Sequence, residues 1–405
     1  GSGGSGIVVL RYPTADVASY TATGLTPTKT TVGTDTVLSF TTVGTGTIST
    51  GEMIFNSTTD KVEYWDGTKW YGITYESTGE SPYNNVLYTG NGIARSITGV
   101  GFEPDLVWIK KRNSASNSSN MLFDSVRGVD KVIITDSTQA QYDGGGTGYQ
   151  TSFDTDGFSI TGNGFVNSGN TFVAWCFKAG GTAVANTNGN IASQVSANVA
   201  GGFSIVKWSG NDTTGGTIGH GLSSTPELTI IKKTSASANW QVSLNASVTG
   251  VEGYMNLNTN AALYTTYPLY YTSSNSTVLS SNGTSSATRL YNNQSADYIA
   301  YCFHSVPGFS KVGSYTGTGA AGNKVDTGFE PAFIMIKRTD GPQDWWIVDN
   351  KISTTSSEFN RYIKVNTLNG TFTPSANINI HIDGFSFDGV SFNNSSQDFI
   401  YIAFA

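Results

Sequence analysis

Pro104-Asp-Leu-Val-Trp-Ile-Lys110 is a short apolar stretch that recurs as Pro226-Glu-Leu-Thr-Ile-Ile-Lys232 and Pro331-Ala-Phe-Ile-Met-Ile-Lys337. A second apolar stretch follows each copy, at 172–177, 298–303 and 399–404. The spacing between the two stretches stays at about 70 residues, and self-similarity at a fixed period marks a repeat architecture. The sequence therefore predicts three copies of one β module.

The first stretch has apolar side chains on both of its faces. Leu106 and Trp108 alternate with Val107 and Ile109, as in a strand buried between two layers. Asn-Gly and Asp-Gly pairs between the apolar runs are strong hairpin signals, and helical periodicity is almost absent. We expect an all-β chain: three tandem β-sandwich (jelly-roll-like) repeats behind a small N-terminal β hairpin or shaft region.

Several positions repeat with the fold and indicate shared structural roles. Each copy has an Asn five residues before its last strand: Asn167, Asn293 and Asn394. The predicted repeat core consists of Trp108, Ile230 and Met335 in the first strand, with Trp175 and Tyr301 in the last strand.

Composition changes along the chain suggest its division into segments. Residues 1–46 are a glycine-rich end with a Thr-rich stretch, read as a linker or extended strands, and residues 47–78 form a hairpin series. The predicted repeats span 79–180, 203–306 and 307–405. Residues 178–202, rich in Gly, Ala and Asn, are expected to link the first two repeats.

The charge balance excludes some partners. The net charge is −7 and no basic run occurs, so nucleic acid is a poor partner. No apolar run approaches the roughly 20 residues of a membrane-spanning helix, so no membrane insertion is expected. Only 13% of residues are charged, which gives uncharged polar surfaces typical of extracellular or virion β proteins.

Three segments resemble tail fibres and related virion appendage proteins of tailed bacteriophages, notably marine and cyanobacterial phages. Gly3–Tyr12 is similar to the end of a glycine-rich fibre domain, and Gly51–Trp70 to a strand–turn–strand element of fibre shafts. Gly101–Lys111, with Phe123–Gly128 and Phe172–Phe177, resembles a repeated β domain of unassigned function. The resemblance implies a place on the virion, in contact with other tail proteins, and supplies no catalytic residues.

The segment 47–75 is too small to bury a core by itself. Association of identical chains with closed symmetry would bury its aromatic side chains. We therefore expect a homo-oligomer, specifically a homotrimer with Trp65 or Trp70 near its axis.

Catalytic and metal-binding patterns are weak. His220, His304 and His381 lack metal-site spacing, and no nucleophile elbow occurs. Asp143, Asp154 and Asp156 are carboxylate candidates, but Asp-Gly pairs are more typical of turns. We expect no enzymatic activity and no cofactor, with calcium on Asp154-Thr-Asp156 as an open alternative.

Two further patterns repeat with the module. Lys110, Lys232 and Lys337 end the first strand, and Asp124 and Asp349 follow 14 and 12 residues later. We interpret these as ion pairs within a module, with ligand contact as the alternative. Cys176 and Cys302 occupy equivalent positions, and Ala403 fills the third, so both are expected to be small buried side chains.

Aromatic residues are the best candidates for ligand binding, because sugar C–H faces stack on aromatic rings. The candidates are Trp345 and Trp346, which point to opposite faces of one strand, and a cluster in the middle repeat: Tyr264, Tyr267, Tyr270 and Tyr271. Three hypotheses follow. They are a fibre protein that binds a bacterial surface glycan without cleaving it, a purely structural virion protein, and a surface-polysaccharide depolymerase.

Overall fold

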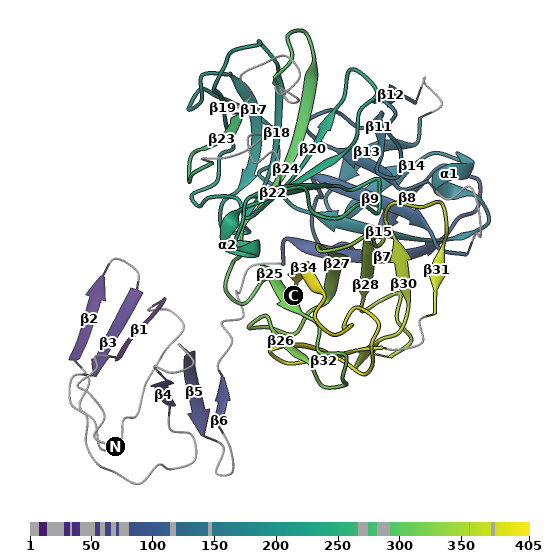
Figure 1. The fold of residues 1–405 in the computed structure, drawn as a ribbon. Coiled ribbons are helices and arrows are strands. Elements are labelled where there is room, and N and C mark those ends of the chain that lie inside the picture. Colours follow the sequence, from purple (N-terminus) through teal and green to yellow (C-terminus); the bar gives the residue numbers. More distant parts are fainter. Residues whose placement is uncertain are drawn as a thin grey trace. The chain divides into compact units, whose positions relative to one another are not determined.

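The computed structural model describes two compact units, Gly1–Tyr75 and Glu76–Ala405 (Figure 1). In the first unit it describes only the backbone of six strands. In the second it describes the chain from residue 81, with the exception of residues 114–118, 145–147, 266–273, 282–291, 356 and 374–376.

The N-terminal unit contains two three-stranded antiparallel sheets. One has the order β1 (Val8–Pro13), β3 (Asp35–Phe40) and β2 (Thr28–Val32). The other has the order β4 (Met53–Asn56), β5 (Lys61–Trp65) and β6 (Trp70–Gly72), with Trp65 opposite Trp70. The predicted hairpin series is therefore present. The Thr-rich stretch contains β2 and β3. Of the two interpretations, a linker or extended strands, the second is therefore correct.

The second unit is all-β, as predicted, and consists of three sandwich modules with one large and one small antiparallel sheet each. In module 1 the large sheet has the order β12 (Tyr142–Asp143), β11 (Lys131–Ile134), β10 (Met121–Asp124), β9 (Leu106–Lys111), β15 (Thr171–Phe177), β7 (Tyr83–Thr89). Its small sheet is β13 (Gln150–Asp154), β14 (Gly157–Ile160), β8 (Arg95–Thr98), and a helical turn, α1 (Gly164–Asn167), precedes β15.

Modules 2 and 3 follow the same plan. The large sheet of module 2 is β16 (Val184–Asn186), β17 (Ser193–Asn198), β18 (Phe203–Ser209), β24 (Asp297–Phe303), β20 (Leu228–Lys233), β21 (Gln241–Leu244), β22 (Gly253–Asn256). Its small sheet is β19 (Gly216–Gly219), β23 (Val278–Ser281), and α2 (Ala246–Thr249) follows β21. Module 3 has the large sheet β25 (Ser310–Thr316), β34 (Asp398–Phe404), β27 (Phe333–Arg338), β28 (Trp346–Asp349), β30 (Tyr362–Lys364), β31 (Thr371–Phe372). Its small sheet is β26 (Lys324–Asp326), β33 (Gly384–Phe387), β32 (Ile378–His381), β29 (Glu358–Phe359).

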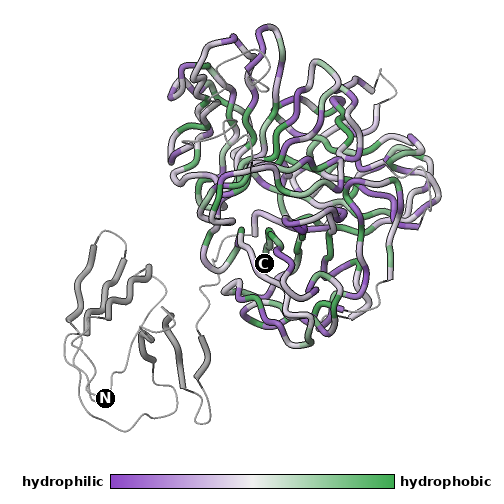
Figure 2. Tube along the Cα trace, in the orientation of Figure 1, coloured by the Kyte–Doolittle hydropathy of each residue, from purple (hydrophilic) through white to green (hydrophobic). Residues whose placement is uncertain are grey.

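The two apolar faces of each large sheet are covered by different partners. Val107 and Ile109 belong to a core inside module 1, whereas Leu106 and Trp108 belong to a central core shared by all three modules. Figure 2 shows hydrophobic segments concentrated along these inner strands. The alternation predicted for the Pro-led strand is therefore present, but its second face is buried by the neighbouring modules.

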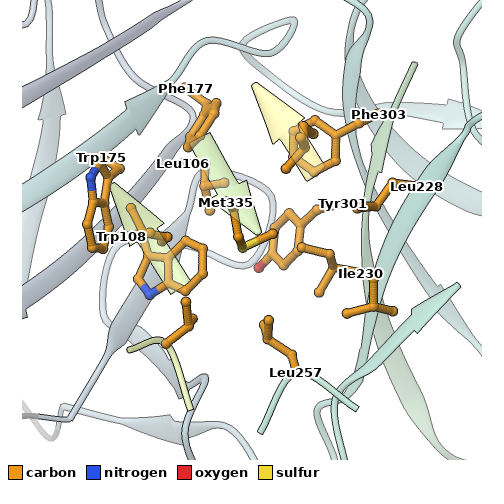
Figure 3. Close-up of a cluster of buried hydrophobic side chains, with 14 of the residues drawn as sticks. Leu106, Trp108, Trp175, Phe177, Leu228, Ile230, Leu257, Tyr301, Phe303 and Met335 are labelled. Carbon is orange, nitrogen blue, oxygen red and sulfur yellow. The ribbon is translucent and has the colours of Figure 1, made fainter. Parts of the chain in front are cut away.

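Equivalent residues of the three modules meet in the central core. The predicted repeat-core residues Trp108, Ile230, Met335, Trp175 and Tyr301 are all buried there (Figure 3). The last long strands end in Phe177, Phe303 and Phe404, whose ring centroids are 5.2–6.2 Å apart in all three pairs. One phenylalanine from each module thus forms a triangle, which the tandem arrangement alone did not predict.

The prediction that residues 178–202 form a linker is wrong. It contains β16 and β17, and β17 pairs along its whole length with β18. Val195 is buried in the core of module 2 while Gln194 is exposed, which is the alternation of a strand with one face in the core. The high content of Gly, Ala and Asn concealed this short pattern.

The repeated asparagine needs a correction of register. Asn167 is buried, and its side-chain amide donates to the carbonyls of Ile93 and Thr161. The residues with this role in the other modules are Asn292 and Asn393, not Asn293 and Asn394. Each of these three accepts a backbone N–H from the turn after the first long strand of its module. An adjacent Asn in modules 2 and 3 made the two choices indistinguishable from sequence.

Candidate functional site

The two candidate tryptophans differ in burial, and neither is a fully exposed side chain. Trp345 is fully buried, and its Nε1 donates to the carbonyl of Asn256 in module 2 at 3.0 Å. Trp346 is half-buried and packs edge-on against Tyr362 and other rings, with the Lys364 ammonium 4.8 Å from its ring centre. Trp345 is therefore not available to a ligand, because a neighbouring module covers it, whereas Trp346 keeps a partly exposed side chain.

Tyr264 is 42% exposed and lies on the surface of module 2. Its ring stacks on that of Tyr254 with a centroid distance of 5.1 Å and an interplanar angle of 23°. Backbone hydrogen bonds in both directions hold the two residues in an isolated bridge. Tyr267, Tyr270 and Tyr271 lie outside the described residues. Sequence analysis missed Tyr254, although its position on a strand beside the cluster was a usable signal.

The three repeated lysines are not paired with Asp124 and Asp349. Each is buried, and its ammonium reaches a backbone carbonyl of another module: Lys110 to Thr367 at 2.8 Å, Lys232 to Thr138 at 2.9 Å, Lys337 to Asn260 at 3.5 Å. Module 1 thus donates to module 3, module 2 to module 1 and module 3 to module 2. The predicted ion pair within a module is wrong, because the strand end points across a module boundary.

A second set of contacts follows the same cyclic order. The residue before β10, β21 and β28 is Asn120, Trp240 and Trp345, and each side chain donates to a carbonyl of the neighbouring module: Val365, Ile134 and Asn256. Backbone bonds run in the opposite direction, from Thr371 to Arg112, from Gln141 to Thr234 and from Leu263 to Thr339. The three modules therefore form one closed assembly with repeated, equivalent boundaries.

The buried lysines make the stability of the unit depend on pH. Burial lowers the pKa of Lys110, Lys232 and Lys337 from 10.5 to about 8. Between these values the unfolded chain binds more protons than the folded chain, so stability rises with pH by at most ~1.4 kcal/mol per pH unit for each lysine. We expect the melting temperature to rise between pH 8 and pH 9. Above pH 9 the buried thiols, and above pH 10 the buried tyrosines, oppose the rise because burial raises their pKa.

Thermal unfolding of Lys337→Met at pH 8.0, 8.5 and 9.0 checks this expectation. The variant should show a smaller increase than the wild type, because one of the three titrating groups is gone. Lys207→Met serves as the control, since Lys207 is exposed on β18. An unchanged pH slope in Lys337→Met would contradict the assignment.

The polar residues considered for catalysis or metal binding have structural partners. Lys131 forms an exposed ion pair with Asp143 at 2.6 Å. Asp154 accepts hydrogen bonds from two serine hydroxyls, and Asp156 accepts the backbone N–H groups of Gly99 and Gly101. Within the described part of the chain, no group of His, Cys, Asp and Glu side chains has the arrangement of a metal site.

His220 and the two cysteines also have structural roles. His220 is buried, its Nδ1 accepts the Leu222 N–H, and burial lowers its pKa. Cys176 and Cys302 are free thiols in the separate cores of modules 1 and 2. Burial raises the pKa of Cys302 to about 12, so it is a poor nucleophile.

The centre of the assembly contains a void of about 30 Å³, lined by aliphatic and aromatic side chains of all three modules, with no polar atom facing it (Figure 3). A void of this size is comparable to one water molecule, and an apolar lining offers no hydrogen bonds. The void is therefore a packing defect and not a ligand site. Among the described helices, none has the length and apolar character needed to cross a membrane.

The fold defines a class of protein: a closed assembly of three β-sandwich modules in one chain. The chain belongs to a family described as a domain of unknown function (DUF7483), whose model matches residues 79–405. The match covers all three modules, so the unit of the family is the assembly and not the single repeat. Comparison with curated proteins and with solved structures gave no match.

Proposed function

We propose that this chain is a virion appendage protein, of the tail-fibre type, that binds a bacterial surface glycan and does not cleave it. The observation that carries the proposal is the stacked pair of Tyr254 and Tyr264 on the surface of module 2. The resemblance of three segments to phage fibre proteins and the low charge of the chain support the same function.

The tyrosine pair suits a sugar because its exposed part combines an apolar ring with a hydroxyl group. Stacking on Tyr254 fixes the orientation of Tyr264, so little side-chain entropy is lost when a ligand binds. Backbone bonds between the two residues add further rigidity. A contact of this kind is weak by itself, and multivalent display raises its effective strength.

Display in several copies would come from the N-terminal unit. Segments of this length are too small to build a full core, and we propose that the unit associates in a homotrimer, with Trp65 or Trp70 near the axis. The three-module unit already closes its own core, so in this proposal it acts as a rigid head. Other tail proteins are the proposed neighbours on the virion.

Tyr264→Ala is expected to weaken binding to host-cell glycan about 2- to 13-fold, since an aromatic contact contributes about 0.5–1.5 kcal/mol. The melting temperature should change little, because substitutions at exposed sites stay within about 0.5 kcal/mol. A glycan array followed by adsorption to host cells measures the effect. Phe165→Ala is the matched control, as Phe165 is 47% exposed on α1 of module 1.

Equal binding by Tyr264→Ala and wild type would remove the tyrosine pair as the binding surface. The alternative of a purely structural virion protein, a capsid decoration or a fibre connector, would then be favoured by the closed core. Loss of polysaccharide viscosity on incubation with the wild-type protein would instead establish a depolymerase.

A further inference from the structure

A polar groove of about 410 Å³ lies at the boundary between modules 2 and 3. Its walls are α2 of module 2 and the edge strands β25 and β26 of module 3. Tyr401 forms part of its floor beneath Gly313, where a Cβ atom would come within 2.7 Å of the Tyr401 hydroxyl. The volume lies in the range of small-molecule sites, which are about 300–1,000 Å³.

The equivalent places at the other two boundaries are filled by the chain itself. β7, β18 and β25 are equivalent, since each pairs with the last long strand of its module. The outer edge of β18 is covered by β17. Beside β7, the Lys351 ammonium donates to Asn84 Oδ1 at 2.8 Å and to the Asn85 carbonyl at 2.5 Å.

Beside β25, neither an added strand nor a lysine of the described residues takes this place. Lys351 stands two residues after Asp349, and Ala246 stands two residues after Leu244, the residue in the same register of module 2. Alanine in place of lysine leaves the space open. The groove is therefore a specific departure from the repeat and not a general gap between modules.

The lining of the groove has one cation that is available to a ligand. Lys311 is half-buried on β25, and no carboxylate of the described residues pairs with its ammonium. Lys324, in contrast, is paired with Asp326 at 2.8 Å and with Asp383 at 2.7 Å. Glu227 is engaged as well, because it accepts the Ser305 backbone N–H and hydroxyl.

The remaining polar groups are hydrogen-bonding groups for hydroxyls. Ser247 and Asp326 both line the groove; Ser247 is exposed, and the side chain of Asp326 is 75% exposed. A carboxylate acceptor and a serine hydroxyl suit the ring hydroxyls of a sugar. A carboxylate on the ligand would pair with Lys311 in a charge-assisted hydrogen bond, which is stronger than a neutral one.

We propose that this groove binds a saccharide unit that carries a carboxylate, with Lys311 on the carboxylate and with Asp326 and Ser247 on ring hydroxyls. The inference rests on the proposed glycan-binding function for its ligand class. Its site shares no residue with Tyr254 and Tyr264, so the two proposals can fail separately.

Calorimetric titration of the full chain with methyl glucuronide, and with methyl glucoside as the neutral match, tests the proposal. Methyl glucuronide should bind at least tenfold more tightly than methyl glucoside, and higher salt should reduce the difference. Lys311→Met should remove the preference for the acid, whereas Lys207→Met should keep it. Lys207 is an exposed lysine on β18, away from the groove lining.

A variant that blocks the groove gives a second, independent test. Ala246→Lys introduces a lysine at the module 2 position that corresponds to Lys351, which fills the equivalent space beside β7. This variant should abolish methyl glucuronide binding without loss of the folded state. Tyr264→Ala should leave this binding intact. Equal affinity for the two glycosides, or unchanged binding in Lys311→Met, would overturn the proposal.

Discussion

Replacement of Trp108 by alanine is expected to lower the free energy of unfolding of the three-module unit by about 3–5 kcal/mol. Trp108 is 5% exposed in the central core, and its ring packs edge-on against Trp175 with a centroid distance of 5.6 Å. It also lines the central void of about 30 Å³, which the substitution would enlarge. The expected loss of stability has two parts: less apolar surface is buried, and the larger cavity adds a cost of its own.

Trp108→Phe is the matched control for this prediction. The Trp108 Nε1 is buried and has no hydrogen-bond partner among the described residues. Phenylalanine keeps a ring in the core and removes this unpaired donor, so the loss should be well below that of the alanine variant. Urea unfolding followed by circular dichroism measures both. A loss under about 1 kcal/mol for Trp108→Ala would contradict the central core.

Replacement of Asp124 by alanine is expected to cost about 3–5 kcal/mol, because it leaves a buried guanidinium without its carboxylate. Asp124 is fully buried, and it binds Arg127 Nε at 2.5 Å and the Tyr301 hydroxyl of module 2 at 2.7 Å. The variant therefore weakens both a buried ion pair and a boundary between modules. Urea unfolding again gives the magnitude.

Two further variants separate the causes. Asp143→Ala breaks the exposed ion pair with Lys131 and should cost only about 0–1 kcal/mol. Module 2 carries Leu244 at the position of Asp124, so an apolar side chain is already used at this position. Asp124→Leu combined with Arg127→Met should recover much of the loss. If Asp124→Ala were as mild as Asp143→Ala, the buried network would have no role in stability.

The sequence determined the module but not its partners. Alternation in the Pro-led strand showed that Leu106 and Trp108 face one layer and Val107 and Ile109 another, because side chains in a strand alternate between faces. The same alternation describes a strand between two sheets of one sandwich and a strand between modules. Repeats and apolar faces were therefore readable, whereas the shared central core was not.

The errors have the same origin. Lys110, Lys232 and Lys337 were assigned to partners nearby in sequence, and Trp345 was named as a ligand-binding candidate, yet each reaches a carbonyl of another module. Such partners lie 77–257 residues away along the chain, beyond any local pattern. The strands β16 and β17 were missed because small and polar residues dilute the alternation of a strand with one buried face.

The two candidate sites differ in how far the sequence alone revealed them. A cluster of tyrosines in the middle repeat was visible in the sequence, and Tyr264 lies exposed at its edge. The groove was not visible, since Lys311, Asp326 and Ser247 come from separate segments of two modules. Local periodicity determined which faces of this protein are buried. Only the tertiary structure decided what covers each face, because that depends on how three modules of nearly equal shape close around one core.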